Sequence, residues 1–158
     1  METKPQIDQE IELGMAEDRF LVFTIDEQDY AMEIRYIIET IEMAPITRVP
    51  FLPSCIKGII NLRGSVIPVM DVRLRFGLPA QEYTERTCII VLDNEGVQLG
   101  LIVDMVQEVA TIPEDRRMPP PSTQAGLGDS IRYIKGMGNV GGEIQLLLDC
   151  NKLMEIQE

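Results

Sequence analysis

The chain has 158 residues, no His and no Trp, and 26 Asp and Glu against 14 Lys and Arg, which gives a formal net charge of −12. Without an imidazole there is no Ser-His-Asp triad, no Cys-His pair and no histidine to ligate a metal or carry a phosphoryl group. A pI near 4.4 disfavours binding to nucleic acid and direct binding to anionic membranes, since both need a basic patch. Most hydrolase and phosphorelay chemistry is therefore disfavoured.

The first 18 residues predict a disordered acidic tail, because they hold six Asp and Glu against Lys4 and show little apolar periodicity. The chain is 45% apolar, which suffices for a folded core, and no apolar run approaches the about 20 residues that span a bilayer. The start also lacks the pattern of a secretory signal, so we expect a cytoplasmic protein. Cys55, Cys88 and Cys150 are far apart and form no C-x-x-C, which favours reduced, packed thiols over metal ligands.

Two stretches of the chain predict β-hairpins with the same layout. Residues 20–25 form an apolar, β-branched run, followed by a turn at 26–29 and alternating apolar residues at 30–34. Residues 88–103 repeat this layout around a turn at 93–96. The similarity of the two stretches indicates an internal repeat.

Shifting the chain against itself supports a duplication. A shift of 69 places Glu39 on Glu108, and after nine extra residues a shift of 78 places 56–58 on 134–136 and Gly64 on Gly142. The two copies run from about 20 to 78 and from 88 to 156. A module of about 60 residues buries too little surface alone, so the copies are expected to pack as one unit.

The second half of each copy predicts another hairpin followed by a short helix. Gly64 and Gly142 supply the positive φ that a tight reversal needs. Asp71 and Asp149 stand where the strand gives way to helix, and we interpret them as N-terminal helix caps and not as catalytic acids. The stretch 116–129 is the longest predicted loop and a candidate for mobility or partner contact.

No recognised nucleotide, calcium or zinc motif is present, and we predict no catalytic residue, metal or cofactor. Arg63 is the most informative side chain, since it corresponds to Gly141 across the duplication and sits at a glycine-containing hairpin turn. A forked guanidinium there fits a carboxylate of its own fold or of a partner, although many surface arginines serve solubility alone.

The string IKGIINLRGSVIPVMDVRLRFG at residues 56–77 closely resembles the signature of the CheW chemotaxis coupling proteins. The resemblance extends over residues 20–34, 48–50, 100–104 and 133–136, and leaves only the tail outside. It implies an all-β fold of two small five-stranded β-barrels of Src-homology-3 type, packed together, with short helices at strand connections and at the C-terminus. The expected limits are a tail at 1–18 and barrels at 19–82 and 83–158, within a single CheW-like domain at 18–156 whose barrels are free to exchange strands.

The resemblance also implies a function, namely a non-enzymatic scaffold that bridges the cytoplasmic tip of methyl-accepting chemoreceptors to the regulatory domain of the histidine kinase CheA. Receptor helices are expected in the groove between the barrels and the kinase at the barrel ends. Arg63 matches the family's functionally important arginine, and we hypothesise that it pairs with Glu39. The expected interface residues are Arg63, Glu39, Ile37, Ile41, Asn61, Gly64 and Gly58.

Two alternatives stay open at this point. The same coupler could serve a chemosensory pathway that controls pili or development instead of flagella. A small enzyme built on Asp71 and Asp149 would need two acids in one pocket with separated pKa values, which no spacing in the chain predicts.

Overall fold

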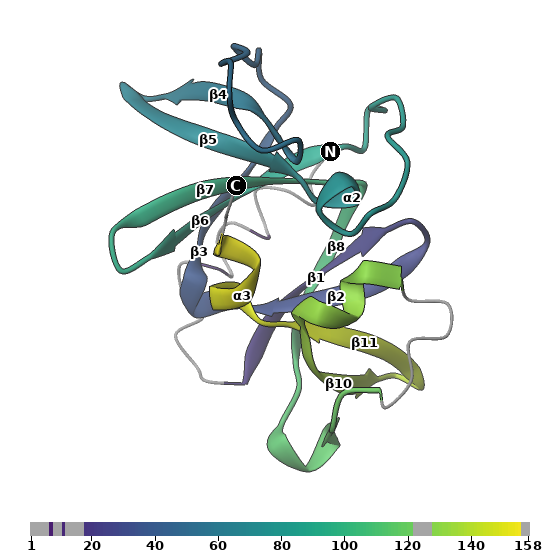
Figure 1. The fold of residues 1–158 in the computed structure, drawn as a ribbon. Helices are drawn as coiled ribbons and strands as arrows, with labels where there is room; N and C mark the ends of the chain where they lie inside the picture. The colour runs from purple at the N-terminus through teal and green to yellow at the C-terminus, as the bar shows by residue number, and fades with distance from the viewer. Residues whose placement is uncertain (1–6, 8–10, 12–17, 122–127, 156–158) are drawn as a thin grey trace.

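The structure is a computed structural model that describes residues 7, 11, 18–121 and 128–155. Strands dominate, as Figure 1 shows. The strands of the first half are β1 (Arg19–Ile25), β2 (Gln28–Glu33), β3 (Ile37–Glu42), β4 (Ile56–Leu62) and β5 (Ser65–Asp71). Those of the second half are β6 (Cys88–Asn94), β7 (Val97–Val103), β8 (Met105–Thr111), β9 (Arg117–Met118), β10 (Ile134–Val140) and β11 (Glu143–Leu148).

Short helical segments connect the strands. The α-helices are α2 (Val72–Arg75) and α3 (Cys150–Met154), and the 3-10 helices are η1 (Ile34–Tyr36), η2 (Glu114–Arg116) and η3 (Gly128–Tyr133). Both α-helices begin at the predicted caps, because Asp71 accepts a hydrogen bond from the Arg73 amide and Asp149 accepts one from the Lys152 amide. The interpretation of the two aspartates as helix caps is confirmed.

The strands form two sheets that do not follow the repeat boundary. Sheet A has the order β8-β1-β2-β11-β10-β9, and sheet B has the order β3-β6-β7-β5-β4. The first-repeat hairpin β1–β2 therefore lies in sheet A among second-repeat strands, while the hairpin β6–β7 lies in sheet B among first-repeat strands. The limits 19–82 and 83–158 describe the repeat in the sequence, and the sheets exchange hairpins across it.

The two sheets correspond strand by strand. A shift of 69 carries β1 onto β6 and a shift of 78 carries β4 onto β10, residue for residue. In each sheet the exchanged hairpin pairs with a third strand on one side and with a parallel strand on the other, as in β2 with β11 and β7 with β5. Sheet A differs only by the two-residue β9 at its edge. The predicted all-β fold of two packed β units is confirmed.

Alternation along the strands divides the apolar side chains among three clusters. On β1, Leu21 and Phe23 join a central cluster, while Phe20 and Val22 face the other way into a cluster within sheet A. On β6, Ile90 joins the central cluster and its neighbours face a cluster within sheet B. Successive side chains of a strand point to opposite faces, so both faces of these strands are buried. Each sheet thus curls around its own apolar cluster, and the central cluster holds the two sheets together.

Most of the tail predicted at 1–18 lies outside the described residues. Ile7 and Ile11 are described, and both are helical and buried in the central cluster. Residues four apart in sequence share one face of a helix, which agrees with the burial of both side chains in this cluster. At these two positions the structure differs from the solvated tail expected from composition. Of the predicted loop at 116–129, residues 122–127 lie outside the described residues.

Candidate functional site

Arg63 stands at the tip of the β4–β5 hairpin. Arg63 and Gly64 both have positive φ, +52° and +88°, and the Gly64 amide donates to the Asn61 side chain at 3.0 Å, which fixes the turn. The Arg63 guanidinium donates to both carboxylate oxygens of Glu39, from Nη1 to Oε2 at 2.5 Å and from Nη2 to Oε1 at 2.6 Å. This is the bidentate geometry that suits an arginine fork. The hypothesis that the two residues pair is confirmed.

The ion pair joins opposite edges of sheet B. Glu39 lies on β3 and Arg63 follows β4, and these are the two terminal strands of the sheet order. The side chain of Arg63 is 69% exposed and that of Glu39 is 16% exposed. A pair with one partner this exposed contributes about 0 to 1 kcal/mol to folding. Its main effect is therefore to hold a cation in a fixed orientation at this end of the sheet.

Three apolar side chains on strands of sheet B are exposed to solvent. Val66 follows the Arg63 turn on β5 and is 61% exposed, and Val97 is 62% exposed on the neighbouring strand β7. Ile38 precedes Glu39 on β3 and is 42% exposed. Arginine is enriched at protein interfaces and among their hot spots, so an oriented arginine with exposed apolar side chains on the same sheet marks a candidate contact surface.

The predicted interface residues divide into surface and buried positions. Asn61 and Gly64 are exposed with Arg63 at the turn, and Ile41 is half buried and packs against the cluster within sheet B. Ile37 and Gly58 are buried, so a partner cannot contact either residue directly. A Cβ at Gly58 would lie 2.2 Å from the carbonyl oxygen of Thr47, which shows that this glycine serves a close backbone approach.

The predicted interface residues include neither Val66 nor Val97, and they also omit two further exposed apolar side chains, Ile38 and Phe51. The irregularity in the β3–β6 register between Ile37 and Glu39 turns Ile38 outward, and a bulge of this kind has no clear signature in a single sequence. Phe51, between two prolines, is 94% exposed and has a φ of +67°, a conformation that costs a bulky residue about 1 kcal/mol or more. The apolar residues next to Phe51 in the sequence gave no indication that its side chain is exposed.

The described residues include neither a group of metal-ligating side chains nor a helix that could span a membrane. Among them, no three His, Cys, Asp or Glu are grouped so that they could hold a metal ion. No helix in this part of the chain is long and apolar enough to cross a bilayer. Asp71 also accepts a hydrogen bond from the Tyr83 hydroxyl at 3.0 Å, so both of its carboxylate oxygens have structural partners.

Comparison with known proteins agrees with this architecture. Residues 19–158 match the family described as CheW-like domain. The chain is 32% identical to the chemotaxis protein CheW of Klebsiella aerogenes over 88% of this chain and 82% of that protein. It is 24% identical to protein FrzA of Myxococcus xanthus over 88% of this chain and 86% of that protein.

A solved structure gives the same result. The crystal structure of the scaffolding protein TtCheW from Thermoanaerobacter tengcongensis matches with a TM-score of 0.80 and 31% sequence identity, covering 90% of this chain and 95% of that one. Membership of one family therefore explains both the sequence signature at residues 56–77 and the architecture of two β units. The chain belongs to the family of CheW-like domains.

Proposed function

We propose that this protein is a non-enzymatic adaptor that couples methyl-accepting chemoreceptors to the histidine kinase CheA in the cytoplasm, at membrane-associated receptor clusters. The observation that carries the proposal is the oriented Arg63 beside exposed Val66 and Val97, in a chain of the CheW-like family. The relatives' names support chemotaxis and scaffolding as the context. The regulatory domain of CheA and the cytoplasmic receptor tip are the expected partners of this surface.

Catalysis is not part of the proposal. Asp71 and Asp149, the acids that an enzyme would use, are hydrogen-bonded as helix caps on separate helices. An adaptor transmits a signal when its contacts differ between the active and inactive arrangements of its partners. The rigid turn at Arg63 is suited to this, because a cation fixed by Glu39 discriminates between partner orientations more sharply than a mobile one.

Calorimetric titration of the full chain tests the proposal. The unaltered protein is expected to bind the isolated regulatory domain of the cognate CheA, or a soluble fragment of the cognate receptor tip, with saturable stoichiometry. Arg63→Glu is expected to weaken at least one of these interactions by about tenfold or more. Arg86→Glu makes the same charge change on an exposed loop and is expected to bind normally. Unchanged binding of both partners by folded Arg63→Glu would contradict the proposal.

A charge exchange separates two roles of the arginine. The double variant Glu39→Arg with Arg63→Glu restores an ion pair across the same two edges of sheet B with the charges reversed. If Arg63 acts by holding the turn, binding returns to near the unaltered level. If Arg63 contacts the partner directly, the double variant stays as weak as Arg63→Glu, because the partner still meets a carboxylate at the turn.

A coupler of a chemosensory pathway with another output, such as pili or development, is the second candidate. The observation that favours it is the similarity to FrzA, a relative whose name does not mention chemotaxis. The Arg63 surface would serve either pathway. Titration against the receptor tips and kinases of each pathway in the same cell distinguishes them, because only the cognate pair is expected to bind with Arg63 dependence.

A further inference from the structure

Lys57 on β4 differs from its counterpart in sheet A in having no carboxylate partner. A shift of 78 carries it onto Lys135 of β10, whose Nζ donates to Glu33 Oε1 at 2.6 Å. A shift of 69 carries Glu33 of β2 onto Ile102 of β7, an apolar residue that is 2% exposed. Lys57 forms no hydrogen bond or ion pair within the described part of the chain. Sheet B therefore keeps the lysine and lacks the carboxylate that neutralises it in sheet A.

A small pocket at this lysine contains a second cation without a partner. The pocket has a volume of about 170 Å³ and is lined by Ile46, Arg48, Ser54, Ile56 and Lys57. Neither the Arg48 guanidinium nor the Ser54 hydroxyl forms a hydrogen bond or ion pair with any residue that the structure describes. No Asp or Glu is among the lining residues. In a chain with a net charge of −12, this pocket is a local concentration of positive charge.

The backbone that carries the lining side chains is fixed to sheet B. Thr47 and Ile59 exchange backbone hydrogen bonds at 2.9 Å, which anchors the segment with the arginine of the pocket beside β4. The Ile56 amide donates to the Pro53 carbonyl at 3.0 Å and closes the turn that carries the serine. The lysine lies on β4 itself. All three donors therefore stand on backbone that is ordered before a ligand binds, which reduces the entropy cost of binding.

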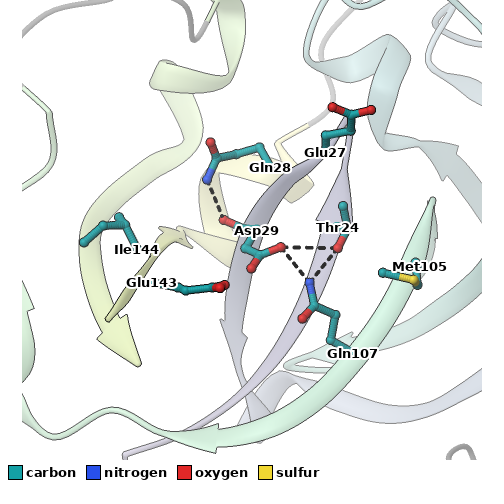
Figure 2. A pocket seen from close by; sticks show the side chains of 8 residues that line it. All are labelled: Thr24, Glu27, Gln28, Asp29, Met105, Gln107, Glu143 and Ile144. Atoms are coloured by element: carbon teal, nitrogen blue, oxygen red, sulfur yellow. Dashed lines mark hydrogen bonds between the residues drawn. The ribbon is translucent and has the colours of Figure 1, made fainter. Parts of the chain in front are cut away.

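A groove on sheet A, shown in Figure 2, has the opposite charge. Its eight lining residues include the carboxylates Glu27, Asp29 and Glu143 and no Lys or Arg. Asp29 Oδ1 accepts hydrogen bonds from the neutral side chains of Gln107 at 2.6 Å and Thr24 at 3.3 Å, as Figure 2 shows, so its charge is oriented and not neutralised. An anion is repelled from this groove and attracted to the pocket of sheet B, so the groove serves as an internal control.

The size and the donors of the pocket favour an anion of the phosphate class. Pockets for larger organic ligands have volumes of about 300 Å³ or more, so about 170 Å³ suits a small ion or a single small group. Arg48 offers a planar fork of donors, Lys57 a compact ammonium and Ser54 a hydroxyl. A phosphate group matches them with at least three acceptor oxygens and a charge of about −1.5 to −2. A carboxylate has only two oxygens and a single charge.

We infer that this pocket of sheet B binds a phosphate group, either free inorganic phosphate or the phosphate of a small monoester. Arg48 and Lys57 are the cationic contacts, and the Ser54 hydroxyl is a further donor. The bound group supplies the negative charge that Glu33 supplies to the corresponding lysine of sheet A. The pocket is a small-molecule site that requires no partner protein. The inference holds or fails independently of the proposed role of Arg63.

An NMR titration of the full chain at neutral pH, with ionic strength held at about 0.15 M, tests the inference. The probes are inorganic phosphate and methyl phosphate, and acetate is the carboxylate control. Saturable shifts are expected at the backbone amides of Arg48, Ser54 and Lys57 and none at Asp29, with acetate weaker by about tenfold or more. The phosphate compound that binds more tightly identifies the ligand as the free ion or an ester. Equal binding of acetate, or no saturable shift at the pocket, would overturn the inference.

Two double variants distinguish the pocket from a general effect of net charge. Arg48→Gln combined with Lys57→Gln is expected to weaken phosphate binding by about tenfold or more, because both cationic contacts are lost. Arg86→Gln combined with Lys152→Gln removes the same two charges from exposed positions elsewhere and is expected to have no effect. Equal losses in the two double variants would show that only net charge matters and would overturn the inference.

Ser54→Asp places a carboxylate in the pocket, on the pattern of Glu33 in sheet A. Ser54 is exposed and lies in a turn, a place where Asp and Asn are common, so the fold accommodates either residue. The new carboxylate is expected to pair with the two cations and to weaken phosphate binding by about tenfold or more. Ser54→Asn, with a neutral side chain of the same size, is expected to bind phosphate within about threefold of the unaltered protein. Equal binding by the two variants would overturn the inference.

Discussion

At the scale of single residues, Arg73 is the cation that ties the two sheets together. Its side chain is 6% exposed and donates to Asp104 at 2.7 Å and to Asp26 at 2.9 Å. Arg73 lies on α2 after β5 of sheet B, whereas Asp26 lies in the turn between β1 and β2 of sheet A. A third hydrogen bond from Nε reaches the carbonyl of Pro79 at 3.3 Å. Each of the three guanidinium nitrogens thus donates a hydrogen bond to a different segment of the chain.

Replacement of Arg73 by methionine is expected to lower the free energy of unfolding by about 2 to 3 kcal/mol, measured by chemical denaturation. The loss stays below that of a fully buried pair, because the two aspartates retain much of their exposure and hence their hydration. Arg86→Met, on an exposed loop, serves as the control. Stability of Arg73→Met equal to that of the control would contradict a structural role for this network.

Cys150 gives the molecule a predicted sensitivity to alkaline pH. The pKa of its thiol is raised to about 12, chiefly by burial and also by the carboxylates of Asp149 and Glu33, while Lys135 and Arg35 act in the opposite direction. An unfolded thiol has a pKa of about 8.5, so the folded state binds this proton more tightly. The stabilisation is complete below about pH 8.5 and is lost as the pH rises toward 12, at up to about 1.4 kcal/mol per pH unit.

The measurement is the free energy of unfolding from about pH 8 to 11 for the unaltered protein and for Cys150→Ala. The curve of the unaltered protein is expected to fall more steeply than that of the variant, because the variant has lost the titrating group. The pKa values of Tyr30 and Tyr83 are raised as well, chiefly by burial, so some decline remains in both proteins. Parallel curves would show that the thiol does not contribute.

At the scale of secondary-structure elements, each short helix depends on its cap. Asp149 accepts the Lys152 amide at 3.1 Å and starts α3, whose Leu153 is buried in the central cluster. Asp149→Ala is expected to cost about 1 kcal/mol of unfolding free energy, whereas Asp149→Asn keeps the acceptor and costs only a few tenths of that. Thermal denaturation of both variants checks this order. A loss of similar size in the two variants would point to the charge of Asp149 and not to its capping hydrogen bond.

Gly58 on β4 tests the close approach of the loop to sheet B. Thr47 and Ile59 exchange backbone hydrogen bonds at 2.9 Å beside it, and a Cβ at Gly58 would lie 2.2 Å from the carbonyl oxygen of Thr47. Gly58→Ala is expected to cost about 2 to 3 kcal/mol, because a backbone atom must move. Gly64→Ala, where nothing lies within 4 Å of the added Cβ, is expected to cost about 1 kcal/mol for its positive φ alone. The reverse order in a denaturation series would contradict the account of Gly58.

The elements were largely predictable because their signals are local. Alternating apolar residues mark the strands, and Gly64 and Gly142 mark the turns, where both glycines have positive φ. The pairing of Arg63 with Glu39 was predictable only through the family resemblance, since 24 residues separate the two in the chain. The burial of Ile37 and the exposure of Ile38 depend on one irregularity in strand register, which a sequence pattern does not encode.

At the scale of the whole molecule, the exchange of hairpins makes the two repeats interdependent. Sheet A needs β1 and β2 from the first repeat, and sheet B needs β6 and β7 from the second. This exchange could not be predicted from the repeat. The hairpins β1–β2 and β6–β7 have the same apolar alternation, so the sequence pattern does not show which of them joins which sheet. Only the burial of both faces of β1 and β6 distinguishes the exchanged arrangement, and that burial is a property of the folded molecule.

The chain is therefore expected to unfold in one transition, and neither half is expected to fold alone. Fragments 1–82 and 83–158 should each lack cooperative thermal unfolding by circular dichroism and should regain it when mixed. The full chain provides the reference signal. A cooperative transition in either isolated fragment would contradict the interdependence of the sheets.

Receptor control of a kinase through this protein is open to a functional assay. The most direct measurement is autophosphorylation of the cognate CheA on membranes that carry the cognate receptor, with the unaltered protein, with Arg63→Glu, and without either. Kinase activity is expected to respond to the receptor ligand only when the unaltered protein is present, and Arg63→Glu is expected to abolish or strongly reduce the response. Receptor control that persists without the protein, or that is unchanged with folded Arg63→Glu, would show that this protein does not couple receptor to kinase through Arg63.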